Sequence, residues 1–244
     1  LYEKVVHGGG GAGVPLDGSG GHPVVAVPLD KIEALLKRVF GGNVPVPTPS
    51  ARKAVGWLLK KPVGTLFDRL SNLATSLAPE LEREVAVKRK GDSISVDFRA
   101  LDLLHDAFLH VVRNSLDHGG ETPEQRETRG KPRQMTIGMS AEILEGGLVH
   151  IRVTDDGQGI NVAAVKARAI EKGLVDARSA NQLSQHEVVQ FVFLAGFSTK
   201  ETVTDISGRG VGMEVLKNIA EKELHGQVEL HSQAGVGTQV DVIF

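Results

Sequence analysis

The 244-residue chain contains no cysteine. This absence excludes disulfides, thiol catalysis and zinc sites with cysteine ligands, and it suits a reducing compartment, so we expect a cytoplasmic location. No apolar run approaches the roughly 20 residues of a membrane-spanning helix, so we expect no direct membrane insertion. Basic residues are not in excess either, because 28 Lys and Arg stand against 30 Asp and Glu. This balance gives no electrostatic footprint for nucleic acid.

The composition, with 41% hydrophobic and 24% charged residues, is typical of an ordinary globular protein. The chain begins at Leu1 and ends at Phe244 inside a strand-like run, so we expect a piece of a longer protein. Residues 1–22 are rich in glycine and read either as a phosphate loop or as a flexible linker. The linker is favoured, because a GK[ST] tripeptide and a strand-to-helix context are both absent.

Two short helical stretches follow in residues 23–62. Ile32, Leu35, Leu36 and Val39 fall at helical spacing after a possible N-cap at Asp30, and glycines and prolines separate them from a second stretch at 51–59. From residue 63 onward the pattern predicts one α/β domain, residues 63–244, with its strands in one sheet that helices cover on one face. The expected helices cover 66–81, 97–118, 163–172, 184–194 and 212–224, and the expected strands 84–90, 135–143, 148–155, 227–232 and 238–244.

Four polar residues of the helix at 97–118 have the spacing i, i+4, i+7 and i+8, so they should share one face: His110, Asn114, Asp117 and His118. The opposite face is apolar, formed by Leu103, Leu104, Ala107, Phe108, Val111, Val112 and Leu116. Such a stripe is either a solvated surface or a ligand site. The Asn114 oxygen and the imidazoles suit a Mg²⁺-phosphate ligand.

A second motif, Asp155-Asp156-Gly157-Gln158-Gly159, directly follows an apolar strand. A carboxylate at Asp155 can accept a hydrogen bond from an exocyclic amine, which would select adenine. Gly157 and Gly159 allow the backbone to approach a flat ring closely. A motif of this kind also suits a tight turn or a calcium loop, so it is weak when taken alone.

The third and fourth motifs are Phe197-Ser198-Thr199-Lys200-Glu201 and a glycine series at Gly208, Gly210 and Gly212. Glycines at a helix N-terminus offer backbone N–H groups to phosphate. Lys200 and Arg209 flank the loop and can meet phosphate oxygens, while residues 201–207 have the composition of a mobile lid. A dinucleotide-binding interpretation is disfavoured, because this series follows a polar loop rather than a strand.

In order and spacing the four motifs resemble the N, G1, F and G2 boxes of the ATP-binding fold shared by histidine kinases, gyrase, MutL and heat-shock chaperones. The final stretch, Gly235 to Val242, resembles the G3 element. The amino-acid sequence in and between these motifs, over about residues 63–244, is most similar to that of chemotaxis-type histidine kinases, the CheA family. The resemblance implies a Bergerat fold, a two-layer sandwich with a mixed sheet. It also implies transfer of the γ-phosphoryl of Mg-ATP to a histidine on a separate phosphotransfer domain, and then to a response regulator.

The same resemblance assigns roles to individual residues. Asn114 is the Mg²⁺ ligand, His110 a general-base-like residue beside the γ-phosphate, and Asp155 the partner of the adenine amino group, with Thr238 supporting the adenine pocket. The implied phosphate contacts are Arg113, His118, Arg168 and Lys200. Asp117, Gly157, Gly159, Ser198, Gly208, Arg209, Gly210 and Gly212 complete the expected nucleotide site. Arg168 stands where the family pattern has a lysine.

The chain also departs from the CheA pattern. Residues 23–62 resemble only a shortened dimerisation hairpin, so we expect a monomer or weak dimer. The phospho-accepting domain and the domain for a coupling protein, through which a receptor would act, are absent. His105-Asp106 resembles a phospho-acceptor pair, but a structural role is favoured because the pair lies on the ATP-site helix. Two rival functions stay open, a gyrase- or MutL-like ATPase, which would carry a glutamate where this chain has His110, and a non-catalytic nucleotide sensor.

Overall fold

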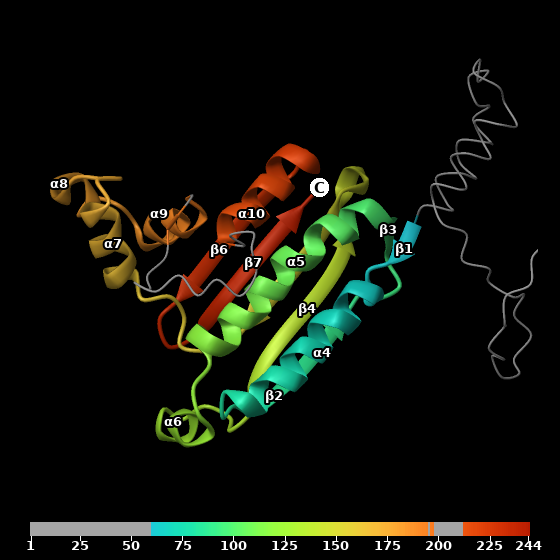
Figure 1. Cartoon of the computed structure of the whole chain (residues 1–244), viewed down its shortest axis with the longest axis horizontal. Helices are drawn as coiled ribbons and strands as arrows, with labels where there is room; N and C mark the ends of the chain where they lie inside the picture. Colours follow the sequence, from blue (N-terminus) through green and yellow to red (C-terminus); the bar gives the residue numbers. More distant parts are fainter. Residues whose placement is uncertain (1–59, 195, 198–211) are drawn as a thin grey trace, which may run out of the picture. The chain divides into compact units, whose positions relative to one another are not determined.

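Five strands form one mixed sheet in the order β2-β4-β5-β7-β6 (Figure 1). The computed structural model describes residues 60–194, 196–197 and 212–244. β2 and β4 are parallel, and every other neighbouring pair is antiparallel. The strands are β2 (Val85–Lys90), β4 (Met135–Ile143), β5 (Val149–Asp155), β6 (Gln227–Gln233) and β7 (Gly237–Ile243).

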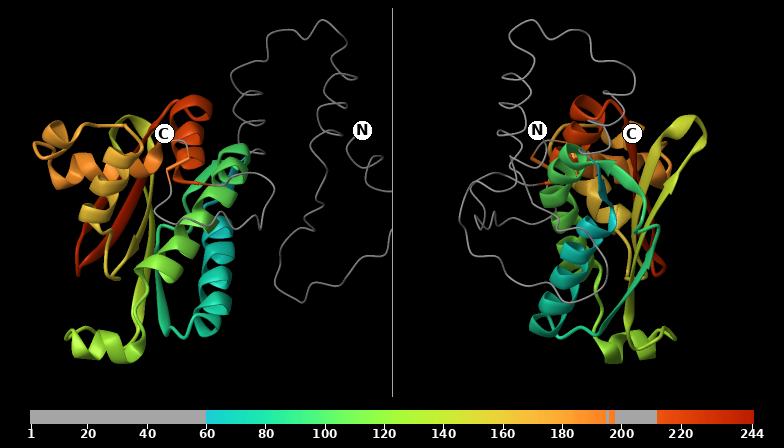
Figure 2. Two further views of the ribbon diagram at one scale, coloured as in Figure 1. Left: turned by 60° about the vertical axis from the view of Figure 1, so that its left-hand side comes forward. Right: turned by 90° about the vertical axis from the view of Figure 1, so that its right-hand side faces the viewer.

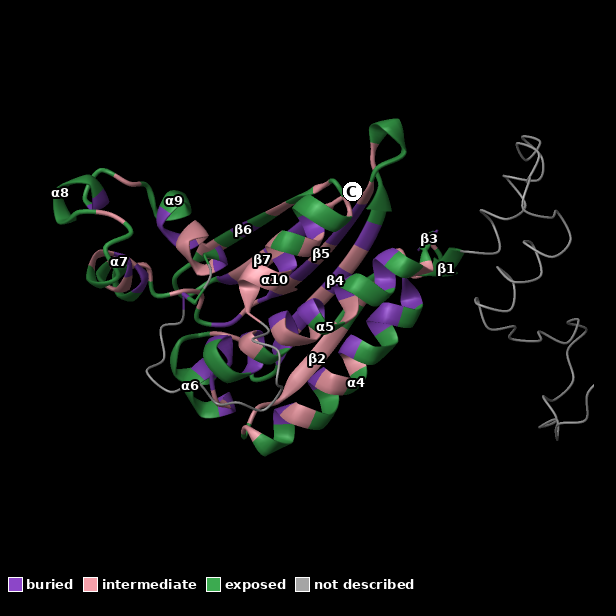
Figure 3. Cartoon of the chain, turned by 45° about the horizontal axis from the view of Figure 1, so that its top comes forward, coloured by how far each residue is buried: buried purple, intermediate pink, exposed green. Residues whose placement is uncertain are grey.

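Three helices, α4 (Gly64–Glu80), α5 (Phe98–Asn114) and α10 (Met213–Asn218), lie against one face of this sheet (Figure 2). Their sheet-facing sides are buried and their outer sides are exposed, as Figure 3 shows for α4 and α5. This is the pattern that a helix with one apolar stripe adopts when it covers a sheet. The predicted α/β sandwich, with a mixed sheet covered by helices on one face, is therefore confirmed.

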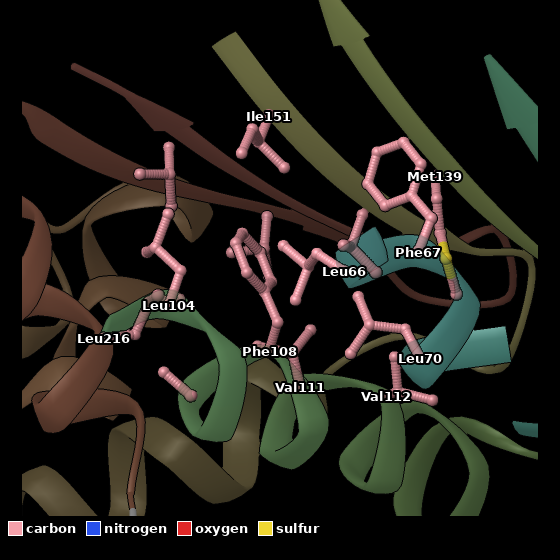
Figure 4. Packing of buried hydrophobic residues seen from close by; sticks show 14 of the residues in the cluster. Leu66, Phe67, Leu70, Leu104, Phe108, Val111, Val112, Met139, Ile151 and Leu216 are labelled. Atoms are coloured by element: carbon pink, nitrogen blue, oxygen red, sulfur yellow. The ribbon is translucent and has the colours of Figure 1, made fainter. Parts of the chain in front are cut away.

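The core fills the space between these helices and the sheet (Figure 4). Phe67, Leu70 and Phe108 have no exposed surface, and they meet strand residues such as Met139 and Ile151. Burying a side chain of this size contributes about 1.5–3 kcal/mol relative to leaving it exposed. Apolar alternation along β4, with Met135, Ile137 and Met139 facing inward, explains why this strand was predicted with its correct bounds.

The shorter elements were the least predictable. β1 (Lys60–Pro62) pairs with β3 (Ser95–Asp97), and neither strand was expected. Also unexpected were α6 (Pro123–Thr128) and α8 (Ala177–Ala180). The helix α6 begins with a capping box in which Thr122 and Gln125 bond to each other's backbone. α7 (Val162–Glu171) was predicted closely, whereas the helix expected at 184–194 is α9 (Gln185–Val189) and a 3₁₀ turn, Gln190–Phe193.

Two further expectations are corrected. The helix predicted to run to His118 is α-helical only to Asn114, and Ser115–Gly119 form a π turn. Leu103, assigned to the apolar face, is 38% exposed. Within the described ranges, no helix has the length and apolar character of a membrane span. The segments predicted for residues 1–59 lie outside the described residues.

Candidate functional site

The Asp155 carboxyl group lies at the end of β5, where only 9% of the residue is exposed. The Ser115 hydroxyl donates to Oδ2 at 2.8 Å, and the Gly157 N–H donates to Oδ1 at 3.0 Å. Burial raises the pKa of Asp155, and the Asp156 charge adds to this, while the hydrogen bonds from Ser115, Gly157 and Thr238 oppose it. Each oxygen has two lone pairs, so a carboxylate held in this way can still accept a ligand N–H.

Ser115 was not identified from the sequence, although it holds Asp155 directly. It lies seven residues after Phe108 and four after Val111, on the apolar side of α5. A buried polar residue on such a face needs a partner, which is the signal that would have found it. The π turn Ser115–Gly119 follows immediately, and π turns occur frequently at functional sites.

His110 and Asn114 are half-buried on the last turns of α5. Burial lowers the pKa of His110, and repulsion from Arg113 and His118 lowers it further. The imidazole is therefore more easily kept neutral near pH 7 than an exposed one. A neutral imidazole offers one donor and one acceptor nitrogen, as a base requires.

The π turn also changes the predicted stripe of polar residues. Asp117 and His118 lie within it, so they do not continue the α-helical spacing of His110 and Asn114. Their side chains are 41% and 47% exposed, and His118 Nε2 lies 3.6 Å from Asp117 Oδ2. The predicted α-helical spacing thus applies to His110 and Asn114, whereas Asp117 and His118 belong to the π turn.

The glycines of the second motif bring backbone segments together. A side chain at Gly157 would have its Cβ 2.3 Å from the Gly119 carbonyl oxygen, so only glycine fits between the π turn and the motif. Gly159 has φ +71°, which favours glycine. In this structure both glycines therefore allow close backbone contacts within the protein, in addition to any approach to a ligand.

Thr238 lies beside Asp155, because the two are paired in the β5–β7 register. Its hydroxyl lies 3.3 Å from that of Ser232, and Ser232 Oγ also accepts from the Ile160 N–H at 2.8 Å. The predicted G3 element thus joins the second motif at the same end of the sheet. The β5–β7 register thus brings together Asp155 and Thr238, which are far apart in sequence.

The structure describes Arg113, Arg168 and Gly212 among the remaining predicted residues, whereas the others lie outside the described ranges. Arg113 is exposed, and Arg168 forms an ion pair with Glu171 at 2.6 Å. Gly212 is the N-cap of α10. Ser198, Lys200, Gly208, Arg209 and Gly210, with the expected lid at 201–207, lie outside the described residues.

A buried group of ions after the π turn was also missed. Arg126 is fully buried, and it and Lys131 donate to the backbone carbonyl groups of Asp156 and Gly157. Glu121, which is 2% exposed, pairs with both cations. The charges come from separate positions in a loop and a short helix, so no periodic pattern marks them.

Comparisons with known proteins agree with this geometry. The model of the histidine kinase-, DNA gyrase B-, and HSP90-like ATPase family matches residues 100–244. The nucleotide-free catalytic domain of histidine kinase ThkA shares the fold, with a TM-score of 0.50, 14% identity, and coverage of 76% of this chain and 93% of that one.

Chemotaxis relatives are more similar in sequence. The chemotaxis protein CheA of Klebsiella aerogenes is 41% identical over 182 residues, which is 75% of this chain and 27% of that protein. The sensor histidine kinase CheAY of Helicobacter pylori is 37% identical over 178 residues, 73% of this chain and 22% of that protein. The matched part is thus about a quarter of the length of these relatives. The chain belongs to the histidine kinase-, DNA gyrase B-, and HSP90-like ATPase family, and its ATP-binding catalytic domain is CheA-like.

Proposed function

We propose that this domain binds Mg-ATP and transfers the γ-phosphoryl group to a histidine on a separate phosphotransfer domain, for onward transfer to a response regulator. The observation that carries the proposal is the buried Asp155 carboxyl group, held by Ser115 and Gly157 at the end of β5. This group has the chemistry to accept a hydrogen bond from the adenine amino group. The similarity to CheA proteins supports the phosphotransfer itself.

On this proposal the adenine end is built by Asp155, Thr238, Gly157 and Gly159. Ser115 holds the carboxyl group in place, and the Thr238 hydroxyl lies beside that of Ser232. Because the carboxylate accepts from an amine, it favours adenine over a purine with a carbonyl oxygen at the same ring position.

Asn114 would hold Mg²⁺ through its side-chain oxygen. No group of three or more His, Cys, Asp or Glu side chains in the described part of the chain is arranged to hold a metal ion. Proteins usually bind Mg²⁺ through one or two carboxylates together with substrate phosphates and water, and the Asn114 amide would supply an oxygen ligand in such a site. When bound, the ion supplies neutralisation of phosphate charge.

His110 lies one helical turn before Asn114, and its pKa is lowered mainly by burial. It is the residue to which the family resemblance gives a general-base-like role. We propose phosphate contacts for Arg113, His118 and Arg168. The same role is proposed for Ser198, Lys200, Gly208, Arg209, Gly210 and Gly212, and Asp117 is proposed as a further residue of the nucleotide site. Arg168 would have to exchange its Glu171 partner for phosphate.

The partners proposed for the whole protein are a histidine-containing phosphotransfer domain, a response regulator and, through other domains, a coupling protein and a receptor. The chain itself should be a monomer or weak dimer that acts on its acceptor in trans. Light scattering tests the assembly, and a tight dimer at low concentration would contradict it.

The direct test is to mix the chain with Mg-ATP and candidate phosphotransfer domains. The proposal predicts phosphohistidine on the acceptor, whereas a gyrase-like ATPase would release phosphate steadily and a nucleotide sensor would only bind.

Asn114→Ala should reduce phosphotransfer below detection and leave the fold intact, because the residue is half-buried at the end of α5 rather than in the core. Circular dichroism provides the folding control, and wild-type rates in the folded variant would remove Asn114 from the site.

A further inference from the structure

The backbone carbonyl groups of Asp156 and Gly157, the two residues after Asp155, accept hydrogen bonds from the side chains of Arg126 and Lys131. The carbonyl oxygen of Asp156 accepts from Arg126 Nη1 at 3.1 Å and from Lys131 Nζ at 3.0 Å. Lys131 Nζ also donates to the carbonyl oxygen of Gly157 at 2.7 Å. Two cations thus converge on the backbone of the second motif.

Glu121 compensates these cations. Its Oε2 lies 2.9 Å from Lys131 Nζ and 3.4 Å from Arg126 Nη1, and its side chain is only 2% exposed. The Lys131 ammonium group therefore uses all three of its protons, on Glu121, Asp156 and Gly157. Charge-assisted hydrogen bonds of this kind are stronger than neutral ones, so the geometry is held firmly.

Arg126 is anchored from several sides. Its Nε donates to the Pro132 carbonyl oxygen at 2.7 Å, and its Nη2 lies 3.1 Å from Asp156 Oδ1. That same Asp156 oxygen accepts from the Thr136 N–H at 2.8 Å, which connects the motif to the start of strand β4. The side chain of Arg126 is 1% exposed, so it serves the interior of the protein rather than the solvent.

The geometry of the peptide bond links this ionic group to the carboxyl group of Asp155. In a trans peptide the C=O and N–H groups point in opposite directions. The peptide between Asp156 and Gly157 has its carbonyl oxygen on Arg126 and Lys131, so its N–H points away from them. That N–H donates to Asp155 Oδ1 at 3.0 Å.

We propose that Glu121, Arg126 and Lys131 form a brace that orients the Asp155 carboxyl group for adenine recognition through the Asp156–Gly157 peptide. The three are positioning residues, because Arg126 and Lys131 contact the backbone of the motif and Glu121 holds these two cations. The proposal rests on the adenine role given to Asp155 in the proposed function.

Lys131→Met tests the brace in the full chain, because it removes the ammonium group while Glu121 keeps its ion pairs with Arg126 and Arg129. The matched control is Arg133→Met. Arg133 lies in the same segment, and its side chain is 47% exposed. It forms ion pairs with Glu84, Glu124 and Glu127, which lie outside the second motif. Lys131→Arg is the conservative variant that retains the charge.

Two readouts separate positioning from general stability. Amide hydrogen exchange at Gly157, measured without nucleotide, should become at least about tenfold faster in Lys131→Met. ATP affinity should fall by about 3- to 10-fold in the wild-type background and by less than about twofold in an Asp155→Asn background, because a residue that acts through Asp155 loses its effect without it. Arg133→Met should change neither readout, and Lys131→Arg should restore most of both.

An ATP affinity that is unchanged in Lys131→Met, or that falls equally in both backgrounds, would overturn the proposal. If Asp155→Asn itself bound ATP like the wild type, the adenine assignment in the proposed function would fail. Hydrogen exchange at the Gly157 amide would then still test whether the brace holds the Asp156–Gly157 peptide. Faster exchange in Lys131→Met would support its hold on the turn, and unchanged exchange would overturn it.

Discussion

Two apolar clusters of different size support different parts of the candidate site. The larger one lies between the sheet and helices α4, α5 and α10, and it carries His110 and Asn114 on α5 and Asp155 on β5. The smaller one has four buried members, Val165, Ala169, Val188 and Phe197. It joins α7 and α9 to the first residue of the third motif.

The two clusters should differ in the free energy needed for local unfolding of the segments that they hold. Protein segments with few buried apolar contacts open at lower free energy than the main core. The adenine end should therefore open only with the whole domain, whereas α7, α9 and Phe197 should open locally. Binding sites that must admit and release a ligand draw on such less stable segments.

The largest effect is expected from the main core. Phe108→Ala should lower the free energy of unfolding by about 3–5 kcal/mol, because Phe108 is fully buried and its loss leaves a cavity. Urea unfolding followed by circular dichroism measures it. Leu103→Ala on the same helix is the control, and because Leu103 is 38% exposed its effect should stay within about 0.5 kcal/mol. Equal losses in the two variants would break the distinction between the faces of α5.

A smaller and more local effect is expected from Phe197→Ala. Phe197 is 9% exposed and stacks on Phe191 with ring centroids 6.5 Å apart. We expect a loss of about 1–2 kcal/mol, with faster amide exchange confined to α7 and α9 while β4 and β5 keep their protection. If protection were lost equally across the sheet, the two clusters would be one cooperative unit.

The smallest effect concerns pH. Because the pKa of His110 is lowered in the folded protein, the unfolded chain takes up its proton first as the pH falls. Folding stability should therefore decline as the pH falls below the ordinary histidine value of 6.5 toward the folded-state pKa. His110→Gln should lose less stability than the wild type between pH 7 and pH 5, by urea unfolding. A steeper loss in the variant would contradict a lowered pKa for the half-buried imidazole.

Sequence patterns predicted the main layers because each depends on a local period. β4 alternates strictly, and α4 and α5 carry clear apolar stripes, so these elements were found within a few residues. Local patterns of this kind need no knowledge of distant contacts. The motifs at Asp155 and Thr238 lie at the ends of paired strands, where the register brings the two residues together.

The missed features depend on such distant contacts. The π turn at Ser115–Gly119 begins at Ser115, whose hydroxyl bonds to Asp155, 40 residues further along the chain. The brace joins Lys131 to carbonyl groups 25 and 26 residues further along the chain. Neither has a period, and single charged residues in a loop are usually solvated, so only the folded structure identifies them.

The central claim is that Asp155 recognises the adenine amino group of ATP. Calorimetry with ATP and with inosine triphosphate, which has a carbonyl oxygen in place of that amino group, tests it in the wild type and in Asp155→Asn. The account predicts that the wild type prefers ATP, and that Asp155→Asn loses about 1–3 kcal/mol of ATP binding free energy and most of this preference. Equal binding of the two nucleotides by the wild type, or an unchanged ATP affinity in Asp155→Asn, would contradict it.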